Sequence, residues 1–164
     1  MSEGREIRCY DYVNHPYPQV RDSLSGSALK IFQAATKGAA ARARSVASEL
    51  RIQIAGIEVG TDIAIAVNKI EHREQAAKSP PVTQMHLQWE AARSPRLFPF
   101  MRATLSIYPL TATETQLDFS GRYEPPLGPL GSAMDALIGH HIAEASVHRF
   151  VREVAEYLRI ELNP

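Results

Sequence analysis

The sequence predicts an α+β fold in which a run of antiparallel strands is followed by one long C-terminal helix. The first observation behind this prediction is a period-two alternation of apolar and polar side chains through the middle of the chain. The second is the stretch from Ser132 to about Glu161, which contains no proline and only one glycine. The chain has 164 residues, a length typical of one domain, so we expect a single domain over residues 1–164.

The chain begins with a strand pattern and continues into helical sequence. Residues 5–13 alternate between two faces, and Cys9 lies on the inner one. Two prolines follow, which end a strand and suit the first turn of a helix. A Ser-Gly-Ser segment at residues 25–27 interrupts the helical pattern, and Gly38 is a candidate stop. We therefore expect two short helices over residues 15–37.

About five antiparallel strands are expected next. The first two form a hairpin over residues 50–67, with a turn at residues 59–62. Residues 71–81 are charged and end in two prolines, so they should contain a loop. Three more strands follow at residues 85–91, 101–107 and 115–123. Most of the strands have one apolar face, and the terminal helix is the only element large enough to cover it.

Charge and composition exclude several classes of protein. The chain has 18 basic and 18 acidic residues, so its net charge of zero weighs against a nucleic-acid-binding or membrane-coating role. No apolar run is long enough to cross a bilayer. The first eight residues lack the apolar segment of a signal peptide, so we expect a cytoplasmic location. The single cysteine cannot form an internal disulfide.

The predicted inner face of the sheet is uncharged, and only Trp89 and Tyr123 have polar tips on it. A pocket bounded by such a face would favour apolar ligands and offer few hydrogen bonds. The same side chains could equally fill a solid core. The candidate ligand-binding residues are Met85, Leu87, Trp89, Met101, Leu105, Phe119, Tyr123, Met134, Ile138 and His141.

The terminal helix carries two apolar sets that are rotated by about a third of a turn relative to each other. The first set is Met134, Leu137, Ile138 and Ala145, with His141 inside the same stripe. The second set is Val147, Val151, Val154 and Leu158. Either the helix bends, or its two halves face different partners. His141 is therefore the best candidate for a polar group in a pocket, although a packed histidine with a satisfied hydrogen bond fits the pattern as well.

Other chemistry has little support in the sequence. His141, Glu144 and His148 share roughly one helical face, and their side chains suit zinc. One helix rarely supplies three ligands, so we expect no metal and no other cofactor. No nucleotide-binding, zinc-protease or serine-hydrolase motif is present. Cys9 is expected to pack in the core rather than to act as a nucleophile.

Three segments together resemble the START-like superfamily, also called the SRPBCC or helix-grip fold and typified by polyketide cyclases. They are the opening strand with its proline-led helices, the hairpin with Glu-Val-Gly at residues 58–60, and Gly-Arg-Tyr-Glu-Pro-Pro-Leu-Gly-Pro-Leu-Gly at residues 121–131 before the terminal helix. The resemblance implies a curved antiparallel sheet wrapped around the long helix, often with a deep cavity between them. The chain shows one strand fewer than the family usually has, unless a strand lies near residues 68–72.

The uncharged inner face and the resemblance together favour non-catalytic binding of a hydrophobic or amphipathic small molecule, such as a lipid, an isoprenoid or an aromatic metabolite. The first alternative is a cyclase or dehydratase in which His141 or Tyr123 is the acid–base group. The second alternative is an interaction module like the chaperone activators of the superfamily, with a filled core and an exposed apolar patch. The sequence does not give the ligand or the oligomeric state.

Overall fold

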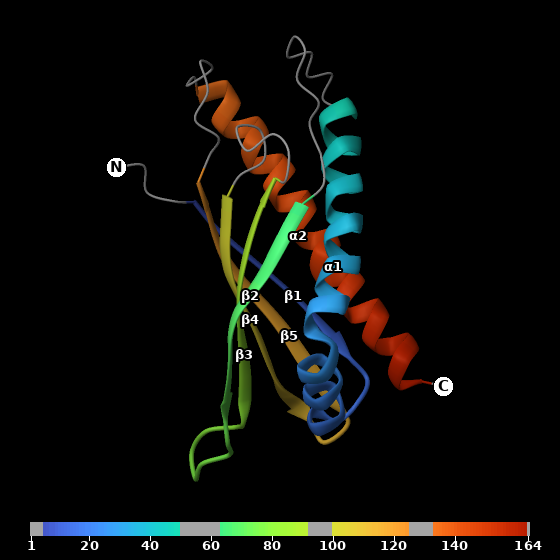
Figure 1. The fold of residues 1–164 in the computed structure, drawn as a ribbon. Coiled ribbons are helices and arrows are strands. Elements are labelled where there is room, and N and C mark those ends of the chain that lie inside the picture. The colour runs from blue at the N-terminus through green and yellow to red at the C-terminus, as the bar shows by residue number, and fades with distance from the viewer. Residues whose placement is uncertain (1–4, 50–62, 92–99, 125–132, 164) are drawn as a thin grey trace.

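The computed structural model describes residues 5–49, 63–91, 100–124 and 133–163. The elements in chain order are β1 (Arg5–Val13), α1 (Tyr17–Glu49), β2 (Ile63–Arg73), β3 (Val82–Ala91), β4 (Phe100–Thr111), β5 (Glu114–Glu124) and α2 (Ala133–Leu162). The predicted α+β class, the strand at residues 5–13 and the long terminal helix are confirmed (Figure 1). The first strand of the predicted hairpin, at residues 50–54, lies outside the described residues.

The five described strands form one antiparallel sheet in the order β1-β5-β4-β3-β2. Strands β2 to β5 follow one another as a meander, and β1 pairs with β5, so the first strand lies beside the last. Both helices pack against this sheet and against each other, with α2 beside β1 and α1 beside β2 (Figure 1). Among the described residues, no helix combines the length and apolar character needed to span a membrane.

The prediction of two short helices is wrong, because one helical segment runs from Tyr17 to Glu49. The Ser-Gly-Ser signal marks a kink, where Ser27 leaves the helical conformation with φ −133° and ψ 22°. Gly38 does not end the helix. A Cβ atom placed there would lie 2.9 Å from a side-chain carbon of Glu153, so this glycine lets α1 approach α2 closely. The alanine-rich residues after it favour continued helix.

Strand β2 is longer than the alternation predicts. It continues to Arg73, so the sequence near residues 68–72 is the second half of β2 and not an additional strand. The register shifts between Val67 and Lys69, which is a bulge. The extra residue changes which positions face the helices, so the half-buried apolar residue after Val67 is Ile70. A strict period of two therefore fails to detect the strand in this segment.

Aromatic side chains fill part of the interior between the sheet and the two helices. Trp89 stacks on Phe119 with a centroid distance of 5.9 Å, and Phe150 of α2 meets Trp89 edge-on at 5.1 Å. Phe32 of α1 lies 5.8 Å from Phe150, so this aromatic cluster joins the sheet to both helices. Such contacts add to the stability gained by burying the rings.

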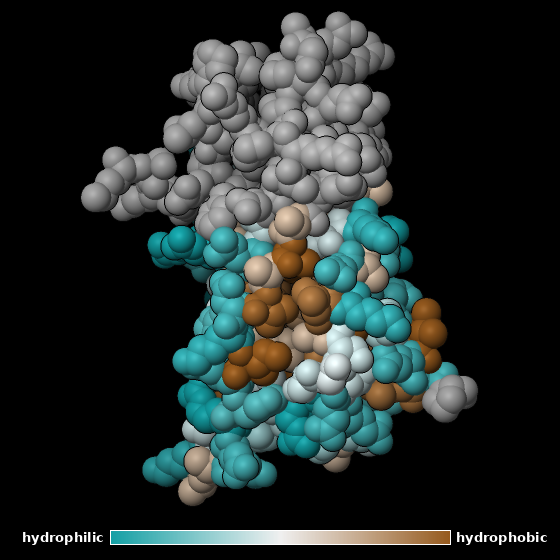
Figure 2. All heavy atoms as spheres, viewed as in Figure 1, coloured by the Kyte–Doolittle hydropathy of each residue, from teal (hydrophilic) through white to brown (hydrophobic). Residues whose placement is uncertain are grey.

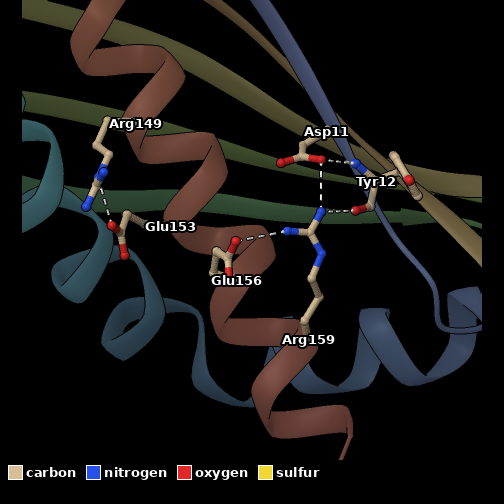
Figure 3. A network of polar contacts seen from close by, with 6 residues as sticks. All are labelled: Asp11, Tyr12, Arg149, Glu153, Glu156 and Arg159. Carbon is tan, nitrogen blue, oxygen red and sulfur yellow. Dashed lines mark hydrogen bonds and ion pairs between the residues drawn. The ribbon is translucent and has the colours of Figure 1, made fainter.

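The C-terminal half of α2 is attached to the edge strand β1 by polar contacts (Figure 3). Arg159 donates to the Asp11 carboxylate at 3.0 Å and to the Tyr12 carbonyl oxygen at 2.7 Å. The same Asp11 oxygen accepts the Tyr12 amide at 2.7 Å. These contacts satisfy both main-chain polar groups of Tyr12 at the open edge of the sheet.

Candidate functional site

The seven candidates from the strands are brought together on the face of the sheet that is turned toward the helices. All are buried, with exposed fractions from 0% to 2%: Met85, Leu87, Trp89, Met101, Leu105, Phe119 and Tyr123. The alternation predicted this face, and the structure agrees with it. The side chains of the other two apolar candidates, Met134 and Ile138, lie outside the described residues.

The polar tips of this face lie in one row across the sheet. Ile65 of β2 pairs with Trp89, Trp89 pairs with Met101 of β4, and Met101 pairs with Tyr123 of β5. Adjacent strands are about 4.8 Å apart, so Trp89 and Tyr123 are roughly 10 Å apart with Met101 between them. This row, called here the Trp89–Tyr123 row, lies where β3 and β5 end and β2 and β4 begin.

Trp89 contributes a buried hydrogen-bond donor that has no acceptor. Its side chain is 1% exposed, and the Nε1 atom has no partner among the described residues. An indole N–H can only donate, and a buried donor without an acceptor costs about 1–3 kcal/mol. Its position on the inner face was predictable, but the missing partner was not.

The hydroxyl of Tyr123, in contrast, lies 2.8 Å from Nδ1 of His140 on α2. Burial raises the pKa of the Tyr123 hydroxyl above its usual value, so the group is neutral near pH 7. His140 also lies 3.6 Å from the Glu144 carboxylate one turn further along the helix. A neutral hydroxyl beside an imidazole can donate or relay a proton, which is the chemistry of an acid–base pair.

His141, the histidine that the sequence favoured, is exposed. The buried face of α2 includes Ala143, Val147 and Phe150. At about 100° per residue, His141 lies about 200° around the helix from Ala143 and therefore points away from the sheet. The apolar stripe that suggested an inward His141 was built on residues at the start of the helix. The buried face would instead have selected His140, which precedes Ala143 by three positions and Val147 by seven.

The other members of the candidate metal group have different partners. Glu144 faces His140, and Nδ1 of His148 lies 3.4 Å from the Cys9 sulfur atom. Within the part of the chain that the structure describes, no group of three such side chains is arranged to hold a metal ion.

Cys9 packs in the core, as its alternation predicts. It is 6% exposed, and burial together with the nearby Asp11 carboxylate raises the pKa of its thiol to about 11. The thiol is therefore protonated at neutral pH, which is the unreactive form.

Two hollows of about 630 Å³ each are lined by described residues, and both lie on the outside of the molecule. One lies over α2 next to β1, where His141, His148 and Arg152 line it. The other lies over the outward side chains of β3, β4 and β5, where Arg102 of β4 and Arg122 of β5 are direct cross-strand neighbours. Neither is the cavity that the sequence predicts between sheet and terminal helix. Residues 92–99 and 125–132, which follow β3 and β5 in the chain, lie outside the described residues, so that cavity stays a prediction.

No family model matches this chain, and no curated protein matches its sequence. Solved structures match it over nearly its whole length. A protein of Thermus thermophilus is 13% identical, with 98% of this chain and 100% of that chain covered and a TM-score of 0.50. The Zhui aromatase/cyclase of a Streptomyces species is 10% identical, with 97% and 96% covered and a TM-score of 0.50.

A conserved protein of Geobacillus kaustophilus is 12% identical, with 96% of this chain and 97% of that chain covered and a TM-score of 0.51. At these identities the likeness shows a shared fold and not a shared activity.

Proposed function

We propose that this chain, which has the helix-grip fold of the START-like superfamily, binds an apolar or amphipathic small molecule between its sheet and α2. The observation that carries the proposal is the uncharged inner face, which ends at a row with two polar tips. A site with a few polar groups in an apolar surface is typical of small-molecule pockets. The proposed site borders Trp89, Met101, Tyr123 and His140. The other rings of the aromatic cluster, Phe119, Phe150 and Phe32, would lie beneath it.

The remaining candidates have different places in this proposal. Leu87 lies on the inner face in the cross-strand row next to Trp89, whereas Met85, Leu105 and Phe119 pair with one another one row deeper in the same face. Met134 and Ile138 are proposed to line the site from the start of α2. Lipids, isoprenoids and aromatic metabolites all have the required apolar surface.

Displacement of an apolar fluorescent dye by candidate lipids and aromatic compounds tests the proposal, together with native mass spectrometry of gently purified protein. Met101→Phe fills space at the row and should weaken binding of the dye about tenfold or more. Leu110→Phe is the matched control, because Leu110 lies on the same strand but is 47% exposed. Thermal unfolding of both variants checks that they fold. Equal dye affinity for the wild type and Met101→Phe would contradict the proposed position of the site.

A cyclase- or dehydratase-type reaction is the second candidate, because Tyr123 and His140 form a hydrogen-bonded pair beside the proposed site. His140 would remove the α-proton of a β-hydroxy ketone, and the Tyr123 hydroxyl would protonate the β-hydroxyl, which leaves as water while the C=C bond forms. The proton taken by His140 would then return to the Tyr123 oxygen. Dehydration of a β-hydroxy aryl ketone, followed by the absorbance of the enone, provides an assay. Tyr123→Phe and His140→Phe should abolish any turnover, whereas His141→Phe should retain it. Loss of turnover in His141→Phe alone would restore the assignment to His141.

A further inference from the structure

We infer that the ligand of the proposed site carries an oxygen acceptor that accepts a hydrogen bond from Trp89 Nε1. The site then selects oxygenated apolar molecules, such as ketones, over hydrocarbons of the same shape. This inference rests on the proposed function and specifies the chemical class of its ligand.

The surroundings of Trp89 explain why its donor has no partner in the described part of the protein. Phe119 stacks on the ring and Phe150 meets its edge, and neither offers a conventional acceptor. The cross-strand neighbours in the row are Ile65 and Met101, of which only the methionine has an acceptor atom, a weak thioether sulfur. Phenylalanine would fill much of the same space without burying an N–H, so the indole has a cost that packing alone does not explain.

Buried polar tips of other aromatic residues have partners. The hydroxyl of Tyr17 lies 2.7 Å from the Thr83 hydroxyl, and that of Tyr123 is bonded to His140. Besides Trp89 Nε1, the buried side-chain polar atoms without a partner among the described residues are the hydroxyls of Ser23 and Ser25 on α1. A serine hydroxyl in a helix can rotate to reach a carbonyl of the preceding turn. An indole N–H is fixed in the ring plane and has no such alternative.

Two ligands of one shape test the inference directly: 9-fluorenone, which has a carbonyl oxygen, and fluorene, which has a methylene group at that position. Their affinities are measured by displacement of an apolar dye. The wild type should bind fluorenone about tenfold more tightly than fluorene, the size of effect expected for one buried hydrogen bond. Trp89→Phe removes the donor, so it should bind the two compounds with similar affinity.

Nuclear magnetic resonance of the wild type gives a second readout that does not depend on a variant folding. The chain has one tryptophan, so the ¹⁵N spectrum contains a single indole N–H signal. Fluorenone should move this proton signal downfield, as a new hydrogen bond requires, and fluorene should not.

The outcomes separate the inference from the function on which it rests. If both compounds bind the wild type equally and leave the indole signal in the same place, the acceptor inference is wrong and the binding function stands. The same holds if the preference for fluorenone persists in Trp89→Phe. If neither compound nor any other apolar probe binds, the proposed function itself fails, and the inference fails with it.

Discussion

Gly121 shows how closely the inner face of the sheet is packed. A Cβ atom at this position would lie 2.8 Å from the Met101 sulfur and 2.8 Å from a ring carbon of Phe119. We predict that Gly121→Ala lowers the free energy of unfolding by about 1–3 kcal/mol, because both of these side chains must move. Urea denaturation followed by Trp89 fluorescence measures the change.

Gly26→Ala is the matched control for this substitution. Gly26 lies in α1, and a Cβ atom there meets nothing within 4 Å. Alanine should leave stability unchanged or raise it by about 0.5–1 kcal/mol, because it restricts the unfolded chain. Equal effects of the two substitutions would contradict the packing described around Gly121.

Cys9 gives a prediction about pH. Its thiol pKa is raised from 9.0 to about 11 in the folded chain, so the folded state keeps its proton where the unfolded state loses it. This contribution to stability is complete below pH 9 and disappears as the pH rises toward 11. The wild type should therefore lose up to about 2 kcal/mol relative to Cys9→Ala between these values. A constant difference between the two proteins across this range would show that the thiol has an ordinary pKa.

At the scale of single residues, the sequence predicted the face of the sheet on which a side chain lies better than it predicted the hydrogen-bond partner of that side chain. The alternation correctly placed Trp89, Met101 and Tyr123 on the inner face, because a strand has only two faces. It could not predict the bond between Tyr123 and His140, which depends on how α2 is rotated against the sheet. The absence of a partner for Trp89 Nε1 among the described residues also depends on the full set of neighbours in three dimensions.

Among the elements, α2 and β1 depend on each other through Arg159. Replacing it with methionine removes its bonds to Asp11 and to the Tyr12 carbonyl (Figure 3). We predict a loss of about 1 kcal/mol in the free energy of unfolding, because the contacts are charged but partly exposed. Arg152→Met on the same helix is the control, since Arg152 is exposed and should change stability by less than about 0.5 kcal/mol. Urea denaturation of both variants decides, and equal losses would contradict the role of Arg159.

The errors of prediction at the scale of elements have local causes. The kink at Ser27 has the same sequence signature as a helix end, because serine and glycine are frequent at both. Gly38 was interpreted as a stop, whereas it allows close contact with Glu153 of α2, which no local pattern reports. The bulge after Val67 interrupted the alternation and concealed the second half of β2.

For the whole molecule, the α+β class and the packing of the terminal helix on one sheet face followed from the sequence, because both depend on simple periodicities and on the need to bury an apolar face. The prediction that only the terminal helix is large enough to cover this face is wrong, because α1 is one long helix that also packs against the sheet. The edge beside β2 remains partly apolar: Ile65, Val67 and Ile70 are half-buried, and Figure 2 shows hydrophobic side chains gathered in the seam between β2 and α1. A ligand cavity does not follow from periodicity, because the same residues can pack together or line a space.

The most direct test of small-molecule binding uses Trp89, the only tryptophan in the chain, as the reporter. An apolar dye such as 1-aminoanthracene is titrated into the wild type, and tryptophan emission is recorded at each addition. A ligand beside the Trp89–Tyr123 row should quench that emission saturably with one dye per chain, and competing apolar compounds should reverse the effect. Emission that stays constant, or falls linearly without saturation, would contradict the account and favour an interaction module with a filled core.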